Sequence, residues 1–325
     1  MKEIIFLHKN KPKWEIIEKF IKDEVIFSPD ELKSAYSNLI DALSYSRTFY
    51  PDSKTTQYLN SLAVKVHSRI YSKKRFDLNN VRQFWMTDLP LIMYHSRKEL
   101  LISFAVFVVS MLIGIISSKY DDSFVRVILG NDYVNMTIRN IEKGDPMAVY
   151  KQANQLDMFL GITFNNIMVS FYAFAMGLLS ALGTGFILFR NGVMLGSFQQ
   201  FFIEQGLFYD YLRTVWIHGT LEISAVIIAG TAGIILGNSF LFPETYSRLV
   251  SFQRGAAKSI RISLGIVPLF IVAGFLEGFV TRLTELPDVI NFFIIILSLA
   301  FVIWYFVIYP IKIYKRSEHA ELKLD

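Results

Sequence analysis

The run LLISFAVFVVSMLIGIISS, residues 100–118, decides the fold class. It contains no charged side chain. At about 1.5 Å per residue, a helix of this length spans roughly 28 Å. The hydrocarbon core of a bilayer is about 30 Å thick, so the run predicts a membrane-crossing helix.

Apolar runs separated by short polar joints continue from this run to residue 310. We expect an all-α polytopic membrane bundle of about six spans, with the other five at roughly 163–181, 186–205, 218–240, 262–281 and 289–310. The runs at 163–205 are almost continuous, and LGTG at 182–185 predicts the turn between them. The alternative is one long helix to Phe189, a break at Asn191–Gly192 and a short re-entrant helix.

Residues 1–99 mix charged and apolar positions as water-soluble helices do. Ser28 is a predicted N-cap, with Pro29 at the first helical position and acidic residues in the first turn. The apolar stretch at the start is too short for a signal peptide, so we expect a retained cytoplasmic end. The sequence predicts a cytoplasmic region of amphipathic helices over 1–99.

Composition narrows the classes of function. The chain is 53% hydrophobic, carries a formal net charge of +5 and contains no cysteine. Disulfides and cysteine metal sites are therefore excluded. Its basic residues are spread among acidic ones without an aromatic-basic strip, so we expect no nucleic-acid partner.

Basic residues orient the predicted spans. They flank residue 100, fill the polar segment 242–261 and begin the tail at 312–325. Basic segments stay cytoplasmic, so both termini should lie on the cytoplasmic side of an inner cell membrane. This orientation requires an even number of crossings. The transmembrane domain then covers 100–311, and segments 119–161 and 206–217 lie outside. Val134, Ile138 and Ile141 predict a surface helix, and a second short helix is expected at about 147–156.

Charged and polar side chains within the predicted spans are candidate functional groups, because burying them in a bilayer is costly. By depth, Glu204, His218, Glu222 and Glu277 fall in the outer half. They are compatible with a proton or cation pathway, or with hydrogen bonds that fix helix packing. The full set is Arg190, Asn191, Glu204, His218, Glu222 and Glu277.

A metal hydrolase is a third possibility. His218 and Glu222 share one helix face at i,i+4, and Glu277 would complete a set of three ligands. A catalytic zinc site usually has more than one histidine, so we expect no metal here. We also expect no other cofactor and no catalytic residue. HExxH, GxSxG, P-loop and GxGxxG motifs are absent from the sequence.

Glycines recur within the predicted spans. Small residues on one side of a helix let a neighbouring helix approach closely. We expect helix packing at Gly192, Gly196, Gly219, Gly230 and Gly233.

Several separated motifs resemble the stage II sporulation protein M family. They occur in order over roughly 100–310 as NIMVSFYAFAMGLLSALGTGFIL (166–188), NGVMLG (191–196), HGTLEISAVIIAGTAGIILG (218–237), PETYSR (243–248) and LEGFVT (276–281). The resemblance implies an integral membrane protein with several helical spans. It assigns no catalytic role to the matching residues.

The resemblance also implies a role for the chain. The founding member belongs to a membrane complex with peptidoglycan-degrading partners during engulfment, where it resembles a scaffold. The long charged N-terminal region and GDPMAVY (144–150) resemble the non-sporulating branch. We therefore expect a non-enzymatic scaffold in the lipid bilayer that binds membrane or envelope proteins, peptidoglycan-degrading enzymes or further copies of itself. The alternative is a transporter or channel using Glu222, Glu277 and His218.

Overall fold

The computed structural model describes residues 3–22, 25, 27–71, 78–151, 154–283 and 286–321. Throughout these ranges the regular structure is helical, which confirms the all-α class. The chain divides into two compact units, Met1–Leu78 and Asn79–Asp325. This boundary differs from the expected one at residue 99, because residues 79–99 pack within the second unit. There the Tyr305 hydroxyl donates to the Trp85 carbonyl at 2.6 Å.

In its described residues, the first unit contains three helices around its own core. They are α1 (Glu3–Ile21), α2 (Pro29–Phe49) and α3 (Lys54–Tyr71). Ser28 caps α2 in a reciprocal capping box with Glu31. Each helix contributes apolar side chains at helical spacing, and the most buried are Phe6, Trp14, Ile17, Leu39, Leu43, Leu59, Leu62 and Val66.

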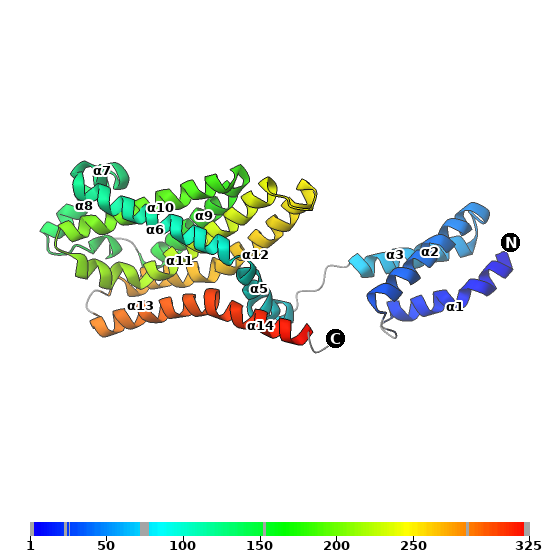
Figure 1. The fold of residues 1–325 in the computed structure, drawn as a ribbon. Coiled ribbons are helices and arrows are strands. Elements are labelled where there is room, and N and C mark those ends of the chain that lie inside the picture. The colour runs from blue at the N-terminus through cyan, green and yellow to red at the C-terminus, as the bar shows by residue number, and fades with distance from the viewer. Residues whose placement is uncertain are drawn as a thin grey trace. The chain divides into compact units, whose positions relative to one another are not determined.

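The second unit is a helical bundle built around α11 (Phe208–Leu241), as Figure 1 shows. In the most apolar stretch of α11, 83% of the residues are buried, against 11% in the last candidate span. Within the described residues, five helices are long and apolar enough to cross a membrane. Their ranges are Arg97–Tyr120, Gln155–Leu179, Phe208–Leu241, Arg248–Val280 and Asp288–Glu318.

Several of these spans join an α-helix to a short 3-10 or π-helical segment. The first is α6 (Arg97–Tyr120), and the second joins α9 (Gln155–Ala175) to the 3-10 turn η3 (Met176–Leu179). The fourth joins α12 (Arg248–Phe275) to the π-helical turn η4 (Leu276–Val280). The last consists of α13 (Asp288–Ile303), η5 (Trp304–Ile308) and α14 (Tyr309–Glu321). The final four residues of the expected tail lie outside the described part of the chain.

The third predicted span is the continuous helix α10 (Ala181–Glu204). The re-entrant alternative with a break at Asn191–Gly192 is therefore wrong. The turn before α10 centres on Ser180, whose φ is 107° and whose hydroxyl caps the helix, so LGTG at 182–185 is helical. α10 has 24 residues, as α6 does, but it is not one of the five helices that are both long and apolar enough to cross, because polar residues such as Arg190 and Asn191 interrupt its apolar sequence. Its crossing stays a prediction.

The polar connections are shorter than expected. α12 begins at Arg248, so only 242–247 remain of the joint expected at 242–261. α11 begins at Phe208, which leaves little of the 206–217 segment outside a helix. Both helices extend into sequence that contains charged side chains, because helical periodicity continues beyond the apolar core of each span.

The segment between α6 and α9 forms α7 (Asp122–Leu129), α8 (Asn131–Glu142) and the 3-10 turn η2 (Ala148–Lys151). Val125 and Val134 turn inward, as amphipathic surface helices require. The helix expected at 147–156 is wrong, since η2 covers part of it and α9 begins at Gln155. Before α6, the unit starts with α4 (Leu78–Gln83), η1 (Phe84–Asp88) and α5 (Leu89–His95).

Glycines set the close contacts between these helices. A Cβ atom at Gly196 would clash with the Met111 carbonyl of α6, and one at Gly192 would lie 2.7 Å from the Phe107 carbonyl. At Gly230 and Gly233 of α11, a Cβ atom would clash with the hydroxyls of Ser103 and Thr184 respectively, among other atoms. These helices therefore pack at distances that only glycine permits.

Gly219 differs from the other expected packing glycines. The nearest atom to a Cβ at this position is Ile223 Cδ1 on the same helix, at 3.8 Å. Gly219 lines a cavity instead of meeting another helix. The packing role expected for it is therefore wrong.

Candidate functional site

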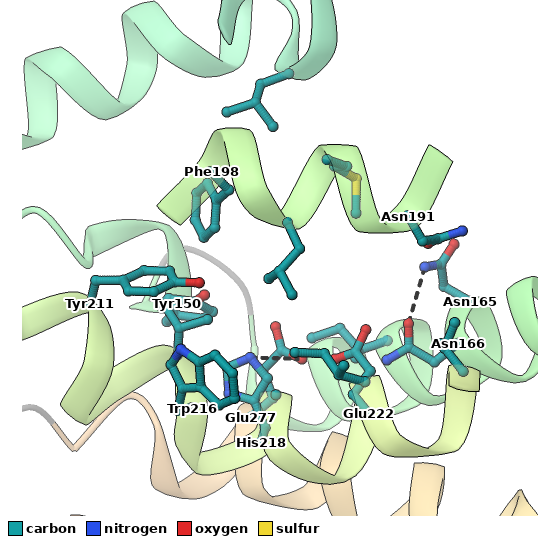
Figure 2. A pocket seen from close by; sticks show the side chains of 18 of the residues that line it. Tyr150, Asn165, Asn166, Asn191, Phe198, Tyr211, Trp216, His218, Glu222 and Glu277 are labelled. Atoms are coloured by element: carbon teal, nitrogen blue, oxygen red, sulfur yellow. Dashed lines mark hydrogen bonds and ion pairs between the residues drawn. The ribbon is translucent and has the colours of Figure 1, made fainter. Parts of the chain in front are cut away.

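Three titratable side chains from two helical segments converge inside the second unit. His218 and Glu222 lie one turn apart on α11, and Glu277 lies on η4. The Nε2 atom of His218 is 3.7 Å from Oε2 of Glu277. One nitrogen or oxygen atom of each residue lies within 4.8 Å of the others. Figure 2 shows the three side chains pointing toward one another.

Local backbone features bring Glu277 to the cluster. η4 is a π-helical turn, which adds a residue to the turn and changes the direction of its side chains. The neighbouring Gly278 lies close to α9, where a Cβ atom would be 3.1 Å from the Gln155 carbonyl. A small residue and a widened turn together allow this part of the chain to pack tightly while Glu277 faces α11.

The imidazole of His218 is held on two sides. Its Nδ1 atom lies 3.0 Å from the Thr281 hydroxyl. The Tyr150 ring meets it edge-on, with ring centroids 5.7 Å apart. His218 is only 4% exposed, and Thr281 is 2% exposed. These contacts orient Nε2 toward the carboxylate side of the cluster.

The cluster opens onto a cavity of about 430 Å³. Asn165 and Asn166 reach it from α9, and their side chains are 3.5 Å apart at Asn165 Nδ2 and Asn166 Oδ1. Asn191 approaches from α10 while its Nδ2 donates to the Ile187 carbonyl. The polar and aromatic lining also includes Tyr133, Tyr150, Tyr211 and Trp216, as Figure 2 shows in part.

Positive charge is missing from this lining. Among the described residues that line the cavity, none is lysine or arginine. Arg213 of α11 is occupied elsewhere, by Asp210 at 2.8 Å and Asp288 at 3.2 Å. Two carboxyl groups therefore share a largely apolar cavity with one histidine and with no lysine or arginine in its described lining, so protons or a cation must balance their charge when both are ionised.

Tyr150 contributes a neutral hydroxyl to the site. It lies on η2, between the surface helices and α9. Burial raises the pKa of the Tyr150 hydroxyl well above its usual value. Tyr150 therefore offers hydrogen bonding without adding negative charge.

The structure separates the predicted polar set. His218, Glu222, Glu277 and Asn191 line the cavity, whereas Arg190 and Glu204 do not. Glu204 is exposed and accepts a hydrogen bond from Gln200 at 2.9 Å on its own helix. The expectation that depth would group Glu204 with the other acids is therefore wrong, because α10 directs it away from the cavity.

Sequence reasoning missed four residues at the site: Asn165, Asn166, Tyr150 and Thr281. The adjacent asparagines inside an apolar run were a usable signal, since amides in a span usually face other helices. Tyr150 and Thr281 carried no comparable signal. Their positions depend on how η2 and the end of the fourth span pack against α11.

Comparison with known families gives two matches. The model of the family described as stage II sporulation protein M matches residues 103–282, more than half of the chain. A second model, described as a domain of unknown function (DUF8413), matches residues 5–72. No curated protein and no solved structure matches the chain.

Proposed function

The chain belongs to the stage II sporulation protein M family, and on this premise we propose that it is a non-enzymatic membrane protein that positions partner proteins. The partners we propose are cell-envelope enzymes, including those that degrade peptidoglycan. The main support is the division of the chain into two compact units. A three-helix unit with its own core and its own family match accompanies the bundle that carries the five candidate spans.

The surface helices α7 and α8 are the second feature that supports this role. Val125 and Val134 pack inward, Val127 is 75% exposed, and polar side chains such as Asp132 remain accessible. Arg126, for example, donates to Asn135 at 2.8 Å on the exposed side. An ordered polar surface at the end of a membrane bundle provides directional hydrogen-bonding groups for a partner protein.

We propose that both termini are cytoplasmic and that α10 is the sixth crossing, in an inner cell membrane. The basic flanks of the spans support this orientation. Packing supports the crossing, because α10 and α6 both have 24 residues and meet closely at Gly192 and Gly196. Figure 1 shows the two helices running side by side.

Site-specific photo-crosslinking in native membranes tests the scaffold role. A photoreactive residue replaces exposed Asp132 on α8, and a control replaces Phe293, an exposed apolar residue of α13 that we expect to face lipid. We expect discrete adducts with envelope enzymes from position 132 and none of these from position 293. Adducts only with other copies of the chain, or none from either position, would contradict a scaffold for envelope enzymes.

The buried cluster favours a second candidate function, a transporter or channel. His218, Glu222 and Glu277 face one cavity, as groups that bind an ion in transit would. Reconstituted into liposomes, the wild-type chain should then carry protons or a cation, and Glu222→Gln should abolish flux without changing assembly. Flux that persists, independent of pH, in the Glu222→Gln/Glu277→Gln double variant would exclude a proton pathway through these carboxylates.

A further inference from the structure

We propose that His218, Glu222 and Glu277 bind a divalent transition-metal ion inside the bundle. The sequence suggested no metal because it offers only one histidine in this region. The structure shows that Glu277, from a separate helical segment, lies beside the pair on α11, with one donor atom of each residue within 4.8 Å of the others. The proposal does not depend on the scaffold role or on ion flux, since a metal can be resident without either.

The distances require only a small closure of the site. Zinc binds imidazole nitrogen and carboxylate oxygen at about 2.0–2.2 Å, so tetrahedral neighbours lie about 3.4 Å apart. His218 Nε2 and Glu277 Oε2 are already 3.7 Å apart. All three donor atoms lie within 4.8 Å of one another, so their separations need to shorten by at most about 1.4 Å. Flexible glutamate side chains provide that movement by rotation about their torsions.

Thr281 prepares His218 for this role. When Nδ1 of His218 carries the proton and donates to the Thr281 hydroxyl at 3.0 Å, the lone pair of Nε2 points into the cluster. Metal-binding histidines usually donate their second ring nitrogen to a neighbouring acceptor in this way. Thr281 is therefore a positioning residue for the proposed metal.

Charge balance points to a divalent ion. Two ionised glutamates would place two negative charges in a cavity that has no lysine or arginine in its described lining. A divalent ion neutralises both charges and replaces the water that the buried carboxylates lack. Two protons would also neutralise the two carboxylates. Measuring bound metal distinguishes protonated carboxyl groups from a bound ion.

The cavity leaves room for a further ligand on the metal. Three protein donors leave at least one coordination position open. The Asn166 side chain lines the same cavity at 6% exposure, and its amide interacts with the Glu222 carboxyl. An amide donor placed there would bind a metal-bound water or the oxygen of a small anionic ligand.

The donor set also selects the metal. Imidazole nitrogen favours zinc, iron, copper or nickel over magnesium and calcium, which prefer oxygen donors throughout. Two carboxylates and no thiolate disfavour copper(I). Zinc is therefore the appropriate first probe, with magnesium as the comparison ion.

Equilibrium dialysis of the detergent-purified, chelator-treated full chain tests the proposal, with Zn²⁺ measured by elemental analysis. We expect about one Zn²⁺ per chain that a large excess of Mg²⁺ does not displace. His218→Ala, Glu222→Gln and Glu277→Gln should each lower the affinity on the order of a hundredfold or more, and Thr281→Val by about 10–100-fold. Glu204→Gln is the matched control, because Glu204 lies outside the cavity, and it should bind as the wild type does.

A second experiment uses only the wild-type chain, so its result does not depend on whether the variants fold. Co²⁺ bound by one nitrogen and two carboxylates should give visible absorption bands that Zn²⁺ abolishes at one equivalent. A wild-type chain that binds no Zn²⁺ and gives no such bands would overturn the proposal and leave protons to neutralise the carboxylates. Equal Zn²⁺ binding by wild type and the three ligand variants would also overturn it, because the ion would then sit elsewhere.

Discussion

His218 Nε2 lies 3.7 Å from Oε2 of Glu277, although the two residues belong to different helical segments. This contact joins the central helix α11 to the end of the fourth candidate span. It makes the end of that span part of the cavity, together with Glu222.

Zinc should stabilise the chain against heat. A ligand that binds only the folded state at a concentration 100 times its Kd adds about 2.7 kcal/mol to the free energy of unfolding. Thermal melts of the chelator-treated chain, with and without Zn²⁺, measure this shift. Glu204→Gln should shift as the wild type does and Glu277→Gln should not; equal shifts in both would contradict the assignment.

Gly196→Ala should destabilise the bundle. Its Cβ atom would clash with the Met111 carbonyl, so α6 and α10 would have to separate. Overpacking of this kind costs typically about 1–3 kcal/mol. The control on the same helix is Gly185→Ala, which has no neighbouring atom within 4 Å and should be neutral or stabilising by up to about 1 kcal/mol.

Unfolding in a mild denaturing detergent, followed by circular dichroism, measures the two glycine variants in parallel. A larger loss of stability for Gly185→Ala than for Gly196→Ala would show that α6 and α10 do not pack as described.

Single cysteines should report the orientation, because the natural chain contains none. With six crossings and a cytoplasmic N-terminus, Lys143→Cys faces outside and Thr245→Cys faces inside. A membrane-impermeant thiol reagent applied to intact cells should therefore label position 143, and position 245 only after permeabilisation. Both side chains are exposed, so burial does not prevent labelling.

Labelling of Thr245→Cys from outside, with Lys143→Cys also outside, would show that α10 does not cross. The bundle would then have five crossings, and the chain termini would lie on opposite sides of the membrane.

Ser28→Ala should loosen the start of α2. The Ser28 amide donates to Glu31 Oε2 at 2.8 Å, and the Glu31 amide donates to Ser28 Oγ at 3.3 Å. Loss of such a cap costs about 1 kcal/mol of helix stability. Hydrogen exchange of the full chain, read by mass spectrometry over 29–40, should be faster in the variant and unchanged over α11.

The same cap should depend on pH. Hydrogen bonds from Ser28 hold the pKa of Glu31 below its ordinary value of about 4.5, so the folded state favours the carboxylate. Its contribution is complete above that ordinary value and is lost as pH falls through the lowered pKa. Glu31→Gln should remove this pH dependence of exchange in α2, and a dependence that survives would place its origin elsewhere.

The sequence predicted which segments become apolar helices, because hydrophobic runs and caps act locally. Residues 100–118 became the core of α6, and Ser28 became the cap of α2. Residues 218 and 222 had to share a face, since helical spacing alone places them one turn apart. The family resemblance over 100–310 was likewise readable from ordered motifs, and the match over 103–282 confirms it.

Tertiary structure decided which polar residues meet. Glu204 and Glu277 looked equivalent by depth, yet α10 turns Glu204 outward while the π-helical turn η4 turns Glu277 toward His218. Gly196 and Gly219 looked alike as packing glycines, yet only Gly196 meets another backbone. Periodicity fixes positions around one helix axis, but the partner of each face depends on contacts between segments far apart in the chain. That is why the sequence determined the helices and their family, and only their packing determined the three-residue cluster and its cavity.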